Sequence, residues 1–411
     1  MNPLVWMLMA QVLAPQSSDA IEAKFVELMT QKKTAEAVAL FSEAVQAKAP
    51  VAVIDQAWVA QTSALGKLSK LGEATRKAMG ERELFVRRVE FEKGAVQTFV
   101  TVNSRLLKVE GFQIKPAPVP YVAAPYSVAD AFASEEVTFG TRGFELPGTL
   151  LVPVGKGPFP AVVLVHGSGP NDRDETQGAN KPFRDLAEGL ASKGVLVFRY
   201  DKRTLVHGAK MTAPTIEAEV VDDAVAAVAL LRARKDVDAK RVTVVGHSLG
   251  AQLGPQVAKA SKASRVVLLA PPARTPWQIL PQQYRYLGVP EADVALLEGK
   301  LNAVRDGKSE EAIMGAPAAY WRDWASRDGL AVAKTLSIPM LVMHGERDYQ
   351  VIEEDAAAWR KGLPKAKHVD VPGANHLFIV GTGKPGPKEY EVPGHVAPEV
   401  VNAIAAFVTA K

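Results

Sequence analysis

The chain has no cysteine among its 411 residues. This absence excludes disulfides, thiolate nucleophiles and cysteine metal sites, so any nucleophile has to be sought among other side chains. The sequence also lacks an H-E-x-x-H motif, an EF-hand loop and a G-x-x-x-x-G-K-S/T loop, and no G-x-G-x-x-G opens a helix after a strand. Because these are the usual metal-binding and phosphate-binding signatures, we predict neither a metal nor a cofactor.

A strong charge excess is missing as well. With 49 Lys and Arg against 45 Asp and Glu, the formal net charge is only +4, and the sequence has no dense basic block. Such a small excess in a chain of this length does not indicate a nucleic-acid partner. Hydrophobic residues make up 47% of the chain, which suits a soluble globular protein with a sizeable core.

Long hydrophobic runs are also lacking, and the apolar stretch Leu4–Ala14 is too short to span a bilayer. It ends in Val12-Leu13-Ala14, which fits a signal-peptidase site, and a polar segment follows. No Lys or Arg precedes it, so an apolar tail or helix that packs on the protein is the alternative. We predict that residues 1–18 are a signal peptide and that the protein is exported, to the periplasm or the medium. It would be cytoplasmic if this segment were not cleaved.

The periodicity divides the rest of the chain into two parts. From Asp19 to Lys77 apolar residues recur at three- and four-residue spacing, which predicts helices. Three strand-like runs then follow, with turn residues between them. These runs are Phe85–Phe91, Ala95–Val102 and Leu106–Phe112. We expect residues 19–114 to form a small α+β domain and the proline-rich residues 115–134 to form a linker.

From residue 135 to 411, short apolar runs alternate with amphipathic stretches such as Ile216–Leu231. The runs are Pro160–His166, Val195–Tyr200, Arg241–Gly246, Val266–Ala270, Pro339–His344 and His368–Val371. Such runs suit strands buried on both faces of a mostly parallel sheet, with helices crossing over. This predicts a doubly wound α/β domain whose ligands gather at the carboxyl ends of the strands. Residues 271–337 break the alternation and are expected to form a helical cap.

One motif carries the chemistry. Gly246-His247-Ser248-Leu249-Gly250 is a G-x-S-x-G that directly follows a strand-like run and precedes a helical stretch. The two glycines permit a sharp strand-to-helix turn, which lifts the serine hydroxyl above the sheet at a helix N-terminus. Ser248 is therefore predicted to be a nucleophile.

A serine nucleophile needs a base, and the chain has only seven histidines. His247 lies inside the motif and is expected to face away from the base position, and His207 precedes the nucleophile, whereas this kind of turn has its base later in the chain. Three others lie in strands or at their ends, where packed imidazoles are expected: His166, His344 and His368. Of the remaining two we favour His376, which follows the last strand, and expect His395 to be a surface loop residue.

The third member of a triad orients the imidazole and stabilises its charged form. The loop after Pro339–His344 offers Asp348 as the best candidate and Glu346 as a weaker alternative. Asp355 is expected on the following helix. The resulting order along the chain is Ser248, Asp348 and His376, which is the order expected with this nucleophile turn.

The oxyanion formed during acyl transfer needs backbone donors. One is expected to be the N–H of Leu249, and the second the N–H of Ser168 or, alternatively, of Gly169, in the glycine-rich loop after Pro160–His166. Gly169 is also a possible residue of the substrate rim. Arg173, further along this loop, belongs either to an ion-pair network or to the rim that touches a polar substrate. The cap aromatics, Trp277 and Trp321 among them, are either core residues of the cap or line an acyl or alcohol pocket.

The run from His166 to Arg203, together with GHSLG, HGERDYQV and GANH, resembles the α/β-hydrolase superfamily, specifically bacterial carboxylesterases related to dienelactone hydrolases and to the acyl-peptidase hydrolase domain. The resemblance extends from about Glu135 to the C-terminus. It implies an α/β-hydrolase fold in which Ser248, Asp348 and His376 are the nucleophile, the acid and the base. The N-terminal part resembles a small cystatin-like or nuclear-transport-factor-like domain, which implies no activity.

We therefore expect a serine carboxylesterase that cleaves a small-molecule ester with a short acyl chain through an acyl-enzyme. The same residues could also act on another acyl bond, namely a peptide, a thioester or a carbon–carbon bond. A third hypothesis makes the N-terminal domain a binding module coupled to the hydrolase. No feature of the sequence indicates an oligomeric state.

Overall fold

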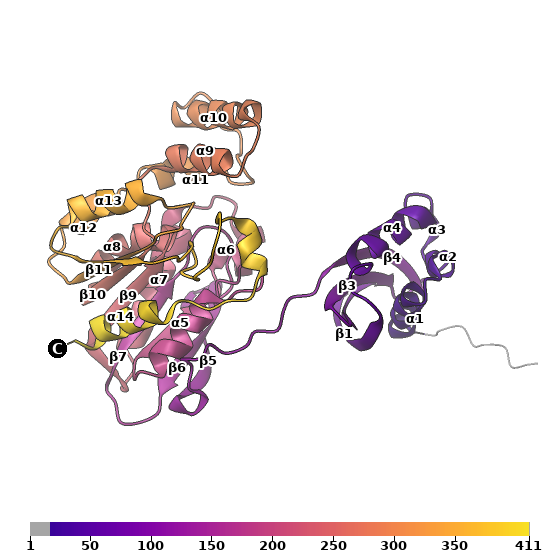
Figure 1. Ribbon diagram of the computed structural model, residues 1–411, viewed down its shortest axis with the longest axis horizontal. Coiled ribbons are helices and arrows are strands. Elements are labelled where there is room, and N and C mark those ends of the chain that lie inside the picture. Colours follow the sequence, from indigo (N-terminus) through magenta and orange to yellow (C-terminus); the bar gives the residue numbers. More distant parts are fainter. Residues whose placement is uncertain (1–16, 411) are drawn as a thin grey trace, which may run out of the picture. The chain divides into compact units, whose positions relative to one another are not determined.

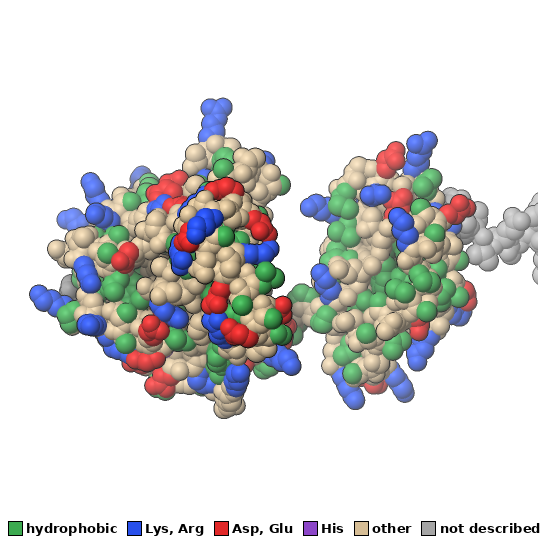
Figure 2. Space-filling model, turned by 90° about the horizontal axis from the view of Figure 1, so that it is seen from above, with side chains coloured by type: hydrophobic (Ala, Val, Ile, Leu, Met, Phe, Trp, Pro, Cys, Tyr) green, Lys and Arg blue, Asp and Glu red, His purple; other side chains and the backbone are tan. Residues whose placement is uncertain are grey.

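The computed structural model describes residues 17–410, and most of the predicted signal peptide lies outside them. The chain divides into two compact units, with the boundary between Val119 and Pro120. No helix within the described range is long and apolar enough to cross a membrane. On the face drawn in Figure 2, basic and acidic side chains are interspersed over each unit.

The first unit places four short helices before a four-stranded antiparallel sheet in the order β1-β2-β3-β4. The helices are α1 (Ser18–Thr30), α2 (Thr34–Val38), α3 (Glu43–Gln46) and α4 (Val51–Thr62), and the strands are β1 (Leu68–Met79), β2 (Arg82–Phe91), β3 (Gly94–Asn103) and β4 (Lys108–Pro116). Phe25 of α1 is fully buried and contacts the rings of Phe41 and Phe112, so helices and sheet share one core.

The prediction of helix up to Lys77 is wrong for its last part. Residues Leu68–Met79 form β1, which pairs antiparallel with β2 after the turn at Gly80. The segment is rich in helix-forming Lys, Glu and Ala, and it is exposed along most of its length, so it carries no alternation of buried and exposed residues. Its strand conformation is decided by pairing with β2, which a local pattern does not contain.

The second unit contains an eight-stranded sheet in the order β12-β11-β10-β9-β7-β8-β6-β5 (Figure 1). The strands are β5 (Phe132–Thr141), β6 (Phe144–Pro153), β7 (Phe159–Val165), β8 (Leu196–Tyr200), β9 (Val237–His247), β10 (Arg265–Leu269), β11 (Met340–Gly345) and β12 (Lys367–Val371). Strands β7 to β12 are parallel, whereas β6 runs antiparallel to β8 and β5 antiparallel to β6. The predicted mostly parallel α/β sheet is confirmed.

Helices cover both faces of this sheet, and β7 shows why. Ala161, Val163 and Val165 belong to the core on one face, which α7 (Asp222–Arg232) and α8 (Leu249–Ser261) complete. Val162 and Leu164 belong to the other core, with α5 (Pro182–Ala191) and α14 (Pro398–Thr409). Because side chains alternate between faces, a strand covered on both sides is a continuous apolar run.

The interval predicted as a cap is largely helical. It contains α9 (Pro276–Tyr286), α10 (Glu291–Arg305), α11 (Ala318–Ala325) and α12 (Gly329–Lys334), and in Figure 1 α9, α10 and α11 lie beyond the end of the sheet. Of the predicted linker, Lys115 and Pro116 complete β4, while Tyr121 and Tyr126 belong to the second unit. The Tyr121 hydroxyl donates to Asp185 on α5, at 2.8 Å.

Candidate active site

Ser248 occupies the tight turn between β9 and α8, in the strand–turn–helix that the motif predicts. Its φ of 52° and ψ of −117° lie in a region that non-glycine residues rarely adopt. A Cβ at Gly246 would lie 2.1 Å from the carbonyl oxygen of Gly250, and one at Gly250 would lie 2.2 Å from that of Val165. Both glycines are therefore needed for the serine to stand clear of the sheet.

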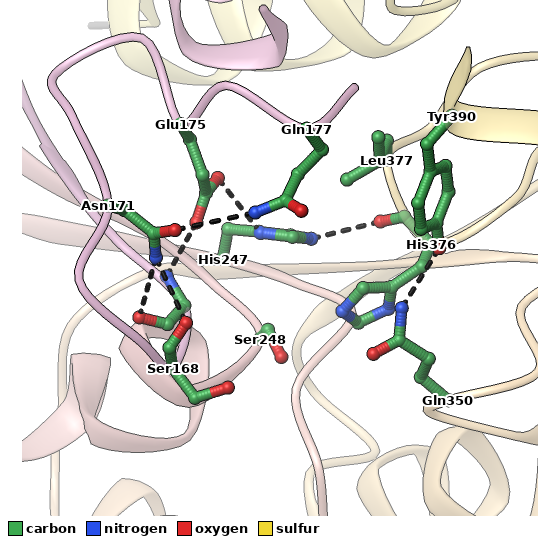
Figure 3. Close-up of a pocket in the computed structure, with 11 residues that line it drawn as sticks. Ser168, Asn171, Glu175, Gln177, His247, Ser248, Gln350, His376, Leu377 and Tyr390 are labelled. Atoms are coloured by element: carbon green, nitrogen blue, oxygen red, sulfur yellow. Dashed lines mark hydrogen bonds and ion pairs between the residues drawn. The ribbon is translucent and has the colours of Figure 1, made fainter. Parts of the chain in front are cut away.

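His376 lies in the loop after β12 and Asp348 in the loop after β11. These strands are parallel, so both loops leave the carboxyl end of the sheet, where Ser248 also lies. The imidazole Nδ1 of His376 lies 2.6 Å from Oδ2 of Asp348, and both side chains are buried. The other carboxylate oxygen of Asp348 accepts the backbone N–H groups of Gln350 and Val351, at 2.8 and 3.0 Å. With Nδ1 donating to the carboxylate, Nε2 is left with a lone pair. Figure 3 shows the hydroxyl of Ser248 facing this imidazole across the pocket.

The alternative acids and the alternative base lie elsewhere. Glu346 is exposed and accepts the backbone N–H of Gly373 at 3.4 Å. Asp355, on α13 (Glu353–Gly362), is buried against Arg274 with its oxygens 2.7–3.1 Å from that guanidinium. His395 lies 3.2 Å from Asp185 of α5. The structure thus pairs His376 with Asp348, whereas Glu346, Asp355 and His395 make other contacts.

The sequence suggested that His247 faces away from the site, and this prediction is wrong. Its imidazole is buried in the wall of the pocket, with its ring centre 4.7 Å from that of His376. Nε2 lies 2.9 Å from the backbone carbonyl of His376, and Nδ1 lies 3.0 Å from Oε2 of Glu175, an ion-pair contact without the alignment of a hydrogen bond. A carbonyl can only accept, so Nε2 donates to it, and Nδ1 is directed at the carboxylate of Glu175.

Charge explains the pairing of Glu175 with His247. Burial disfavours the imidazolium, but the carboxylate of Glu175 outweighs it and raises the pKa of His247. Burial likewise disfavours the carboxylate, and the charge of His247 lowers the pKa of Glu175 below its ordinary value. Glu175 also has an unusual φ of 51°. Sequence analysis missed this pair, since 72 residues separate its members along the chain. The only signal was a carboxylate in a loop that leaves a strand near the nucleophile.

Of the two predicted backbone donors, Ser168 lies in the loop after β7 and Leu249 is the first residue of α8. Ser168 lines the pocket beside Ser248, and the N–H groups of Ser168 and Leu249 have no acceptor within the described part of the protein. Gly169 adopts a φ of 90°, which suits glycine. The side-chain amide of Asn171 donates to the carbonyls of Gly167 and Ser168, at 3.2 and 3.0 Å, and so holds the loop closed.

Ser168 lines two cavities. The first, of about 190 Å³, contains Ser248 and His376 and has a mostly polar wall. Its other polar side chains are Asn171, Glu175, Gln177, His247, Gln350 and Tyr390 (Figure 3). The second, of about 460 Å³, has a largely apolar wall that includes Leu280, Met314, Tyr320, Trp321 and Trp324 of the cap. Trp321 and Gly169 both line this second cavity.

Arg173 and Trp277 line neither of these cavities. The guanidinium of Arg173 lies 3.0 Å from Asp201 and also contacts Glu136 and Thr149, so its donors are used inside the protein. This is the ion-pair network that the sequence offered as one of two readings. Trp277 packs against the core on the cap side.

The fold and this site define an α/β hydrolase. The model of the alpha/beta hydrolase family matches residues 162–383, and the chain belongs to this family. It is 40% identical over 396 residues to Esterase EstD of Thermotoga maritima, and the match covers 93% of each chain. Among solved structures, Est1E from Butyrivibrio proteoclasticus is similar over 67% of this chain and 99% of its own, at 17% identity and a TM-score of 0.46. An esterase of Pyrobaculum calidifontis is similar over 67% and 85%, at 20% identity and a TM-score of 0.45.

Proposed function

We propose that this protein is a serine carboxylesterase with Ser248 as nucleophile, His376 as general base and Asp348 as the orienting acid. The observation that carries the proposal is the 2.6 Å contact between Asp348 and the Nδ1 of His376, beside a serine on a strained strand-to-helix turn. The relative that is 40% identical is named an esterase, which supports the same class of bond.

The proposed chemistry has two steps. The Ser248 hydroxyl attacks the ester carbonyl while His376 takes its proton, and the oxyanion accepts hydrogen bonds from the N–H groups of Ser168 and Leu249. The intermediate then expels the alkoxide, which leaves as the alcohol after taking the proton from His376. Water, deprotonated by the same imidazole, cleaves the acyl-enzyme and releases the carboxylic acid. No metal or cofactor enters this proposal.

The two cavities suggest how an ester would lie. The leaving oxygen has to reach His376, so the alcohol part belongs in the polar cavity that contains this residue. The acyl part then points past Ser168 toward the apolar cavity under the cap. We propose short acyl chains, because the indoles of Trp321 and Trp324 stand in the wall of that cavity.

The function is tested with Ser248→Ala. We expect wild-type protein to hydrolyse p-nitrophenyl acetate and to bind a fluorophosphonate covalently, and we expect the variant to do neither above background. A variant that hydrolyses the ester as fast as the wild type would refute the assignment of Ser248. Comparing kcat/KM for ester, thioester, anilide and diketone substrates identifies the preferred bond, since a triad alone does not choose it.

We also propose that residues 1–18 direct export and are removed. The described residues begin after most of this segment, so the proposal stands on its sequence pattern alone. N-terminal sequencing of the protein from a bacterial periplasm or culture medium tests it, and an intact Met1 in the exported fraction would contradict it.

A further inference from the structure

Both backbone groups of Gly167 are held by buried charged side chains. The Gly167 carbonyl accepts a hydrogen bond from the ammonium of Lys202, at 2.8 Å. Its N–H donates to the carboxylate of Glu175, at 2.6 Å. Lys202 and Glu175 are each only 2% exposed. Hydrogen bonds of this kind to ionised groups are stronger than those between neutral groups, so Gly167 is clamped from two sides.

The clamp determines where the N–H of Ser168 points. The Gly167 carbonyl and the Ser168 N–H belong to the same planar trans peptide and point in opposite directions. Because Lys202 and Asn171 hold the carbonyl on one side, the N–H is directed to the other. Ser168 and Ser248 line the same pocket, and the N–H of Ser168 has no acceptor of its own among the described residues.

The Gly167 carbonyl would have a hydrogen-bond donor even without the ammonium of Lys202. The side-chain amide of Asn171 already reaches it at 3.2 Å. The ammonium of Lys202 has in addition a buried counter-charge, Glu219, at 2.6 Å. A buried ion pair of this kind is weak evidence for stability, because removing both charges from water is costly. A positive charge beside the carbonyl oxygen does, however, polarise the amide and make its N–H a better donor to a developing oxyanion.

We propose that Lys202, on the Gly167–Ser168 peptide, and Glu175, on the preceding His166–Gly167 peptide, are positioning residues that fix Gly167 from both sides. The N–H of Ser168 is thereby preset as an oxyanion donor, and the ammonium of Lys202 polarises it. The inference rests on the proposed esterase function and adds to it two residues that do not touch the reacting atoms. Lys202 follows β8 and Glu175 lies in the loop beyond Ser168, so two segments of the chain set the two peptides on either side of Gly167.

The test is a double variant, Lys202→Met with Glu219→Gln, which removes the ammonium without leaving its carboxylate unpaired. The matched control is Arg203→Met with Asp223→Asn, which removes the neighbouring buried ion pair and leaves Gly167 untouched. Removing an oxyanion donor outright costs about 10²–10³ in kcat, so weakening one should cost roughly 10–10². We expect this fall in kcat for p-nitrophenyl acetate with KM within about threefold of the wild type.

A boronic acid, which forms a tetrahedral adduct on the serine, supplies a second readout. Its affinity should fall by the same factor as kcat/KM in the double variant and stay unchanged in the control. An unchanged kcat, or equal losses in variant and control, would overturn the clamp. If the double variant does not fold, Glu175→Leu, which removes the acceptor of the Gly167 N–H, replaces it, and there too an unchanged kcat overturns the proposal. Failure of the proposed function is a separate result, since wild-type protein would then be inactive on every ester.

Discussion

At the scale of single residues, two buried pairs of a histidine and a carboxylate lie at the candidate active site, His376 with Asp348 and His247 with Glu175. The pairing of His376 with Asp348 could be predicted from the sequence by elimination, because few histidines follow the serine motif and one acidic loop follows the preceding strand. The Glu175–His247 pair could not. Its two members approach only because the loop after β7 returns over the turn that carries Ser248, and the length of that loop does not predict the contact.

The Glu175–His247 pair predicts a pH-dependent stability. The pKa of His247 is raised above its ordinary value of 6.5, so its contribution is complete below about 6.5 and is lost as pH rises through the folded-state pKa. The pKa of Glu175 is lowered below its ordinary value of 4.5, so its contribution is complete above about 4.5 and is lost as pH falls through its folded-state pKa. The pair therefore stabilises most between these two values.

We expect Glu175→Gln to lower the free energy of unfolding by about 2 kcal/mol near pH 5.5 and by less near pH 9, measured by urea denaturation. The control is Asp185→Asn, which removes another buried carboxylate beside a histidine, His395. Burial raises the pKa of Asp185, so its charged form destabilises, and the deficit of this variant should shrink as pH rises from acid toward about 5.5. The deficit of Glu175→Gln should grow over the same range, because the pKa of Glu175 is lowered. An effect of Glu175→Gln that is equal at both pH values would contradict the ion pair.

At the scale of elements, the cap supplies the aromatic wall of the apolar cavity. Helix α11 brings Tyr320, Trp321 and Trp324 together, with the two indoles stacked at 5.6 Å. The Trp321 indole N–H donates to the carbonyl of Ile313 at 3.0 Å, and that of Trp324 donates to Gln252 of α8 at 2.8 Å. These bonds fix the aromatic wall of the apolar cavity, so its size is a property of the cap and not of the sheet.

Shortening this wall should change acyl-chain preference. We expect Trp321→Ala to raise kcat/KM for longer p-nitrophenyl esters relative to the acetate by about tenfold, because the removed ring leaves room beside Ser168. Trp277→Ala is the matched control, since Trp277 packs on the core and lines neither cavity. The same shift in both variants would mean that loosening of the cap, and not the wall, sets chain length.

At the scale of the whole molecule, the two units have separate cores, and the segment after the boundary belongs to the hydrolase unit. Tyr121 donates to Asp185, the ring of Tyr121 lies 4.1 Å from the guanidinium of Arg184, and the Tyr126 hydroxyl donates to the carbonyl of Val396 at 2.8 Å. These contacts tie residues 121–126 to α5 and to the chain just before α14. The hydrolase unit should therefore be defined from Pro120.

Two truncations test this definition. A chain that begins at Pro120 should keep kcat/KM for p-nitrophenyl acetate within about twofold, because every residue of the proposed site lies beyond it. A chain that begins at Phe132 loses Tyr121 and Tyr126, and we expect its unfolding midpoint to fall by several degrees, roughly 2–4 °C per kcal/mol lost. A large loss of activity in the chain that begins at Pro120 would show that the first unit contributes to catalysis.

Sequence by itself determined the α/β hydrolase class, the strand-to-helix turn at Ser248 and the order of the candidate triad, because buried strands and glycine turns leave local patterns. It did not determine that Leu68–Met79 is a strand, since only pairing with β2 makes it one. Nor did it determine the clamp on Gly167 or the contact of Glu175 with His247. Those depend on distances between segments far apart in the chain, and such distances exist only once the loops close over the sheet.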